Sequence, residues 1–178
     1  PENTYEDIET LMKDAGETAK RLDVEIIGGH TEITDAVNKI VISTTVIGKI
    51  KKDKLQTVNN IKVGDKILMT KTTAIEGTSI LLNDLESYFN NKMDINMIEE
   101  GKGYGKYLSV LEEGRIGGKT GINYMHDITE GGVLGAVWEA QNAINKGIKI
   151  YKDAIPVTDV TKEVCKILDI NPLRLISS

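Results

Sequence analysis

Two glycine-containing acidic turns, far apart in the sequence, constrain this chain more than any other feature. They span residues 28–32 (Gly-Gly-His-Thr-Glu) and residues 126–132 (His-Asp-Ile-Thr-Glu-Gly-Gly). Each follows an apolar run typical of a β-strand, and the second leads directly into a helical apolar pattern. Paired glycines let a backbone approach a ligand closely. The neighbouring Asp, Glu, His and Thr side chains offer ligands for a metal–phosphate group. The two turns together favour nucleotide or phosphate binding.

The bulk composition narrows the class of protein. The net charge of −5 argues against nucleic acid or an anionic membrane as the main partner. No apolar run reaches the length of a membrane span. Cys165 is the single cysteine, and its apolar setting favours a buried, inert thiol over a nucleophile. One unpaired thiol agrees with a reducing compartment, and we expect the protein to be cytoplasmic.

Helical and strand-like patterns alternate along the chain, which predicts a mixed α/β (α+β) fold. Apolar residues at three- and four-residue spacing predict helices over residues 5–22, 76–89 and 133–144, and from residue 159. Strands are expected at residues 24–27, 40–50, 66–70, 122–127 and 148–151. The region between residues 90 and 103 is expected to be irregular. The polar stretch 51–60 is the natural break between two parts.

Asp127 is the first candidate for chemistry, because it lies at a predicted strand end just before a helix. Thr129 is expected to cap that helix. Gly131 and Gly132 weaken a first helical turn by roughly 1 kcal/mol each relative to alanine. A chain that keeps them is expected to use the backbone amides near an anion. The alternative is a capping arrangement without a ligand.

The turn at residues 28–32 is the second candidate. Glu32 suits a hard cation such as Mg²⁺ better than His30 does. The alternative is a tight turn with exposed side chains. Lys71 follows a threonine-rich strand end and is expected to meet a phosphate or a substrate carboxylate. The alternative there is a solvated lysine before an ordinary helix start.

Taken in order, these segments resemble one family. The order is Gly-Gly-His-Thr-Glu, a Val/Ile/Thr-rich strand, Gly-Asp-Lys-Ile-Leu-Met-Thr-Lys, Glu-Gly-Thr, Met-His-Asp-Ile-Thr-Glu-Gly-Gly-Val-Leu-Gly and Asn-Pro-Leu-Arg-Leu-Ile-Ser-Ser. This order resembles the aminoimidazole ribonucleotide (AIR) synthetase superfamily. The most similar branch contains the hydrogenase expression/formation proteins that help to make the cyanide ligand of nickel–iron hydrogenases.

The resemblance implies two α/β domains, dimerisation through the first, and ATP with Mg²⁺ as cofactors. Residues 1–55 would be the end of the first, ATP-binding domain, and residues 56–178 an incomplete second domain. The resemblance places His30 and Glu32 near the nucleotide, and Asp127, Thr129 and Gly131 beside the phosphates or the second substrate. We expect Asp127 to be catalytic and, with Glu32, to bind the metal. The phosphate-binding set would be Gly28, Gly29, His30, Thr31, Lys71, Thr129, Gly131 and Gly132. His30 departs from the acidic residue that the family often has there.

The implied activity is ATP-dependent phosphorylation of a carbonyl or amide-type oxygen in hydrogenase maturation. The implied substrate is an acyl or carbamoyl group on a small molecule or a protein. The chain begins without methionine and stops within an apolar segment, so we expect a fragment that is inactive alone. Two alternatives stay open. One is a non-catalytic, dimerising scaffold that docks a maturation protein, and the other is a small-metabolite kinase of the same superfamily.

Overall fold

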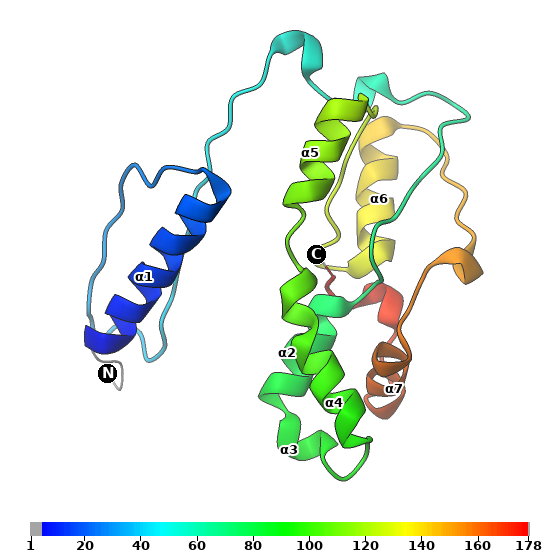
Figure 1. The fold of residues 1–178 in the computed structure, drawn as a ribbon. Helices are drawn as coiled ribbons and strands as arrows, with labels where there is room; N and C mark the ends of the chain where they lie inside the picture. The colour runs from blue at the N-terminus through cyan, green and yellow to red at the C-terminus, as the bar shows by residue number, and fades with distance from the viewer. Residues whose placement is uncertain (1–4, 178) are drawn as a thin grey trace. The chain divides into compact units, whose positions relative to one another are not determined.

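The computed structural model describes residues 5–177, and the chain divides into two compact units, Pro1–Lys49 and Ile50–Ser178. Figure 1 shows the helices of both units. The first contains helix α1 (Tyr5–Leu22), as the apolar spacing predicts. Its first turn is acidic and its last turn basic, which suits the helix dipole. No residue of α1 is buried.

The expected β-strands do not form within residues 5–177. The segments at residues 24–27 and 40–50 have no regular structure, and Ile27, Val46 and Ile47 are each 82% exposed. The segments at residues 66–70, 122–127 and 148–151 are likewise irregular. A strand is stable only when a neighbour pairs its backbone N–H and C=O groups. The mixed α/β expectation is therefore met in its helices and is wrong for its strands in the described residues.

The second unit is built around four helices. They are α2 (Ile75–Asp84), α3 (Glu86–Phe89), α4 (Ile95–Lys102) and α7 (Asp159–Ile167), and Figure 1 shows α2, α4 and α7 together. These helices and the short helix η3 (Gly103–Tyr107) together bury one apolar cluster, which consists of Ile75, Leu82, Phe89, Ile98, Tyr104, Val160 and Val164. Burial of such side chains from water is the main force that holds the unit together.

Two details of the helical prediction in this region are wrong. The expected single helix breaks at Leu85, which is 42% exposed and therefore not on a buried stripe. The region expected to be irregular contains α4, with Ile98 fully buried. Asp94 caps α4 by accepting a hydrogen bond from the Asn96 amide. This cap satisfies a backbone donor that would otherwise lack a partner.

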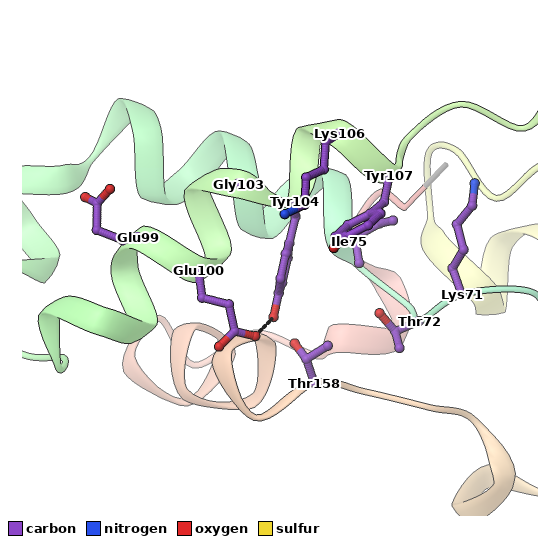
Figure 2. A pocket seen from close by; sticks show the side chains of 10 residues that line it. All are labelled: Lys71, Thr72, Ile75, Glu99, Glu100, Gly103, Tyr104, Lys106, Tyr107 and Thr158. Atoms are coloured by element: carbon purple, nitrogen blue, oxygen red, sulfur yellow. Dashed lines mark hydrogen bonds between the residues drawn. The ribbon is translucent and has the colours of Figure 1, made fainter.

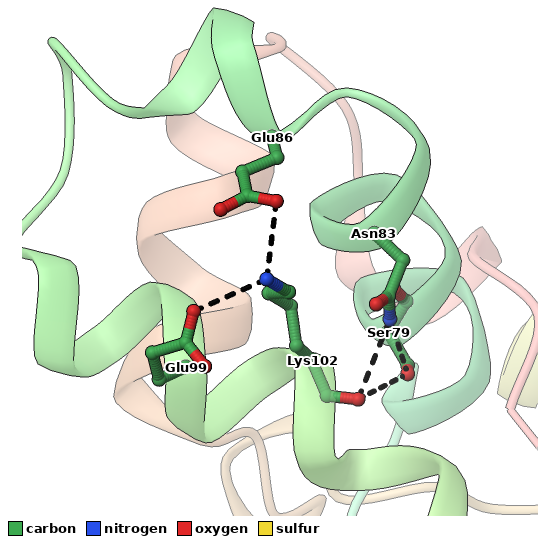
Figure 3. A network of polar contacts seen from close by, with 5 residues as sticks. All are labelled: Ser79, Asn83, Glu86, Glu99 and Lys102. Carbon is green, nitrogen blue, oxygen red and sulfur yellow. Dashed lines mark hydrogen bonds and ion pairs between the residues drawn. The ribbon is translucent and has the colours of Figure 1, made fainter.

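A polar network fixes α2, α3 and α4 to one another (Figure 3). The Lys102 ammonium lies 3.1 Å from both a Glu86 and a Glu99 carboxylate oxygen. Hydrogen bonds to Glu86 first, and then to Glu99, raise the pKa of Lys102. The Lys102 carbonyl accepts a 2.9 Å hydrogen bond from Ser79 Oγ. Lys102 therefore ties α4 to both α2 and α3.

The remaining long helices are α5 (Leu111–Thr120) and α6 (Gly132–Ile144). Helix α6 was expected over nearly these residues, and it ends at Asn145, which adopts φ +49° in place of a glycine. Thr158 caps α7 by accepting a hydrogen bond from the Thr161 amide. Cys165 is 3% exposed, as expected, and burial raises the pKa of its thiol to about 11. Among the described helices, none has the length and apolarity needed to cross a membrane.

Candidate functional site

Asp127 lies in the loop before α6, with its side chain 61% exposed. The His126 ring beside it contacts two acidic residues. Its Nδ1 lies 2.5 Å from the Asp127 carbonyl oxygen and 3.6 Å from Oδ1 of the same residue. Its Nε2 lies 3.2 Å from Oε2 of Glu139, two turns into α6. His126 thus links the Asp127 loop to α6, a role for His126 and Glu139 that the sequence did not indicate.

The backbone conformation and packing of the turn explain the paired glycines. Gly131 and Gly132 adopt φ +81° and +61°, where L side chains are strained. A Cβ on Gly132 would lie 2.7 Å from the carbonyl oxygens of Leu173 and Leu175. Close packing of backbone on backbone therefore requires glycine at position 132. Their predicted contact with phosphate is a separate matter and stays a prediction.

Thr129 does not cap α6. The N-cap position is Gly131, which has no side chain to cap with, and the Thr129 carbonyl instead accepts a 3.0 Å hydrogen bond from the Gly132 amide. The expected cap is therefore wrong, because the tight turn at Thr129–Gly132 places the start of α6 at Gly132 and its N-cap at Gly131. The Thr129 side chain remains a candidate phosphate ligand.

Three segments singled out in the sequence meet in the second unit. The Ser177 amide donates to the Ile128 carbonyl at 3.2 Å, which joins the C-terminal segment to the Asp127–Gly132 turn. Ser177 Oγ accepts from the Ala74 amide at 2.9 Å, and the Gly77 amide donates to Ile176 at 3.0 Å. The C-terminal segment therefore lies between that turn and the start of α2.

Lys71, the predicted phosphate-binding lysine, already has partners. Its Nζ donates to the Ser109 carbonyl at 2.7 Å and lies 3.2 Å from Oε1 of Glu113. The pKa of Glu113 is lowered, first by its own backbone amide and then, against partial burial, by Lys71 and Thr70. A phosphate would thus have to compete with Glu113 for this ammonium group.

A cavity of about 430 Å³ opens beside Lys71 (Figure 2). Tyr104 forms part of its wall and donates a 2.8 Å hydrogen bond to Glu100. Burial raises the pKa of the Tyr104 hydroxyl to about 12, so it stays a donor at neutral pH. Lys106 Nζ lies 4.8 Å from the centre of the Tyr107 ring. The cavity is lined by Lys71, Thr72, Ile75, Glu99, Glu100, Gly103, Tyr104, Lys106, Tyr107 and Thr158.

The turn at residues 28–32 belongs to the first unit and is exposed throughout. His30 Nε2 lies 3.8 Å from Glu32 Oε2, with both side chains more than two-thirds exposed. A Cβ on Gly28 or Gly29 would meet nothing within 4 Å, so no close approach in this unit requires those glycines. Thr31 is likewise exposed. Glu32 and Asp127 belong to different units, and their expected meeting stays a prediction.

Few side chains in the described residues are arranged to bind Mg²⁺. Within residues 5–177, no group of three or more His, Cys, Asp or Glu side chains could hold a metal ion. Mg²⁺ bound with a nucleotide uses one or two carboxylates together with phosphate oxygens and water. The exposed carboxylate of Asp127 fits that arrangement, whereas a cage made by protein side chains alone does not.

Comparison with known proteins identifies the family. Residues 62–178 match the family described as AIR synthase related protein, C-terminal domain, and the chain belongs to this family. The chain is 36% identical over 174 residues to a putative hydrogenase expression/formation protein of Methanocaldococcus jannaschii, covering 96% of this chain and 48% of that protein.

Two further relatives have the names of enzymes. Carbamoyl dehydratase HypE of Escherichia coli is 25% identical, over 95% of this chain and 48% of that protein. A selenide, water dikinase of Campylobacter jejuni is 30% identical, over 88% of this chain and 43% of that protein. The chain spans about half the length of these relatives. No solved structure matches it significantly.

Proposed function

We propose that the full-length protein is an ATP- and Mg²⁺-dependent enzyme of hydrogenase maturation that activates a carbonyl or amide-type oxygen by phosphorylation. Membership of the AIR synthase related family supports the class, and the names of the hydrogenase-linked relatives support the pathway. The observation that carries the proposal is the meeting of the Lys71 loop with the Asp127–Gly132 turn through Ser177. These are the segments of the second unit for which phosphate binding is predicted.

Phosphoryl transfer depends on positioning and charge neutralisation more than on covalent chemistry by the protein. ATP supplies the phosphoryl group that turns the substrate oxygen into a leaving group. Asp127 would hold the nucleotide-bound Mg²⁺ through its exposed carboxylate, and His126 would keep that carboxylate in place. Thr129, Gly131 and Gly132 would lie beside the phosphates. Lys71 would leave its ion pair with Glu113 and instead contact a phosphate oxygen, which would neutralise phosphate charge.

The acceptor group has a candidate place in the cavity beside Lys71. Its apolar wall includes Ile75 and Tyr107, and its polar groups include Glu100, Tyr104 and Thr158. Small-molecule sites combine apolar walls with a few polar groups in this way. An acyl or carbamoyl group, free or carried by a maturation partner, is the substrate class that we propose.

Residues 1–55 would contribute the end of the first, ATP-binding and dimer-forming domain, and residues 56–178 the first part of the second. In that arrangement, Glu32 would be the second carboxylate on Mg²⁺. Gly28, Gly29, His30 and Thr31 would approach the nucleotide in the assembled protein. The present exposure of this turn leaves it accessible to such a ligand.

A non-catalytic scaffold is the second candidate, and one observation favours it: Lys71 is held by Glu113 and Ser109 rather than presented to a ligand. A small-metabolite kinase is also kept, since a dikinase is among the relatives. All three candidates differ in nucleotide binding or in the acceptor, so nucleotide binding is the first property to measure.

The test is calorimetric titration of the full-length protein with ATP and Mg²⁺. We expect Asp127→Asn to weaken binding about tenfold, a loss of roughly 1.4 kcal/mol. The matched control is Asp153→Asn, which changes an exposed carboxylate in a short helix (Lys152–Ala154) outside the candidate site. Unchanged affinity in Asp127→Asn would refute the site, and no nucleotide binding by the unsubstituted protein would favour the scaffold.

A further inference from the structure

Ser177 joins the two candidate phosphate-binding segments of the second unit. Its hydroxyl accepts a hydrogen bond from the Ala74 amide at 2.9 Å and donates to the Thr72 carbonyl at 3.4 Å. Its own amide donates to the Ile128 carbonyl at 3.2 Å. The residue is 1% exposed. One buried serine therefore uses its side chain on the Lys71–Ala74 loop and its backbone on the Asp127–Gly132 turn.

The Lys71–Ala74 loop has an unusual conformation that needs support. Lys71 and Ala74 adopt φ +57° and +63°, which residues other than glycine rarely do. Such conformations persist when the surroundings hold them, and they gather at functional sites. The Thr73 amide is anchored to the Pro156 carbonyl at 2.9 Å. The Ala74 amide relies on Ser177, because Ala74 is fully buried and water cannot replace the hydroxyl.

On the other side, the C-terminal segment contacts the Asp127–Gly132 turn through backbone groups. The carbonyls of Leu173 and Leu175 pack closely on Gly132, and the Ile128 carbonyl accepts from Ser177. Removing the Ser177 hydroxyl would therefore release the Lys71–Ala74 loop and leave the hydrogen bond to Ile128 intact. The side chain and the backbone of this residue can be tested separately.

We propose that Ser177 is a positioning residue that couples the two segments, so that a phosphate-bearing ligand on one segment also orders the other. This inference rests on the proposed function, because it assumes that both segments serve one ligand. Ser177 does not touch the ligand in this proposal. It acts through the Ala74 amide on one side and the Ile128 carbonyl on the other.

The experiment is amide hydrogen exchange on the full-length protein, with and without ATP and Mg²⁺. In the unsubstituted protein, ligand slows exchange in both segments, residues 72–75 and 128–132. In Ser177→Ala, exchange at the Ala74 amide rises about tenfold without ligand, as expected for one lost buried hydrogen bond. When ATP and Mg²⁺ are added to Ser177→Ala, exchange slows in only one of the two segments. A purely structural role would lower the melting temperature without separating the two segments.

Ser79→Ala is the matched control. Ser79 is also nearly buried and also donates its hydroxyl to a backbone carbonyl, that of Lys102 at 2.9 Å. We expect Ser79→Ala to leave ligand protection of both segments as in the unsubstituted protein. Ser177→Cys, which keeps the volume but accepts hydrogen bonds weakly, serves if the alanine variant does not fold, and we expect it to fall between serine and alanine.

The outcomes separate this inference from the proposed function. Ligand protection of both segments in Ser177→Ala, as in the unsubstituted protein, overturns the coupling. If the unsubstituted protein shows no protection by ATP and Mg²⁺, the proposed function fails, and exchange without ligand decides the coupling. In that case faster exchange at residues 128–132 in Ser177→Ala, but not in Ser79→Ala, supports the coupling, and equal exchange overturns it.

Discussion

Nε2 of His126 lies 3.2 Å from Oε2 of Glu139, so an imidazole in the Asp127 loop is joined to a carboxylate two turns along α6. The other ring nitrogen faces the Asp127 carbonyl and carboxylate. The His126 side chain is 25% exposed, whereas that of Glu139 is 53% exposed. The ring therefore holds the Asp127 loop against α6 while leaving the Asp127 carboxylate open to solvent.

We predict that His126→Ala weakens binding of ATP and Mg²⁺ about fivefold, because Asp127 loses its orientation. The melting temperature should change little, since partly exposed contacts between a ring nitrogen and a carboxylate contribute little to stability. Glu139→Gln keeps a hydrogen-bond acceptor for the ring and should reduce affinity less than the alanine variant. Calorimetry and thermal unfolding measure the two properties. A large fall in melting temperature with unchanged affinity would show that His126 supports the fold alone.

Gly132→Ala should destabilise the protein by about 3 kcal/mol. The added Cβ would be strained at φ +61° and would meet two backbone carbonyls that cannot move independently. Gly118→Ala in α5 is the control, because its Cβ would meet nothing within 4 Å. That variant should gain roughly 0.5–1 kcal/mol from helix propensity. Denaturant unfolding checks both values, and similar stabilities for the two variants would contradict the packing argument.

The helices were predicted where the signal is local. The apolar spacing in α1 and α6 depends on residues three and four positions apart, and both helices form nearly as expected. Helix α4 was missed because its region is mostly polar, although Asp94 before Ile95 is a recognisable N-cap signal. The strands were wrong because pairing depends on a distant partner that periodicity does not specify.

At the candidate site, local motifs could be recognised in the sequence, whereas contacts between distant residues could not. Glycine pairs and acidic residues singled out the Asp127–Gly132 turn as a candidate, and its binding of phosphate stays a prediction. The role of Ser177 could not be predicted, since its hydrogen bonds join it to residues as distant in sequence as Ala74 and Thr72. The pairing of Lys71 with Glu113 was missed for the same reason.

Cys165 should react slowly with thiol reagents in the folded protein. It is 3% exposed, and burial raises the pKa of its thiol to about 11, so at pH 8 very little is present as the reactive thiolate. Reaction with a chromogenic disulfide at pH 8 should be complete within seconds to minutes in denaturant and far slower without it. Fast labelling of the folded protein would indicate that α7 opens readily.

The lowered pKa of Glu113, caused first by its own backbone amide and then by Lys71 and Thr70, predicts a dependence of stability on pH. The folded state lowers the pKa of Glu113 below its usual 4.5, so the ionised carboxylate stabilises the fold above that value. This contribution is lost as the pH falls through the lowered pKa of the folded state, because the folded carboxylate must then take up a proton. Thermal unfolding between pH 7 and pH 3 should therefore show a smaller acid-induced loss in Glu113→Gln than in the unsubstituted protein.

The same substitution tests whether Lys71 is available to a phosphate. With Glu113 neutralised, the ammonium group no longer has a charged partner within 3.2 Å. We expect Glu113→Gln to bind ATP and Mg²⁺ a few-fold more tightly, and Lys71→Met to bind about fivefold more weakly, as for a gained or lost charged hydrogen bond. Calorimetry at pH 7 and moderate salt measures both. If both substitutions lower stability and neither alters affinity, Lys71 serves only to hold the loop against α5.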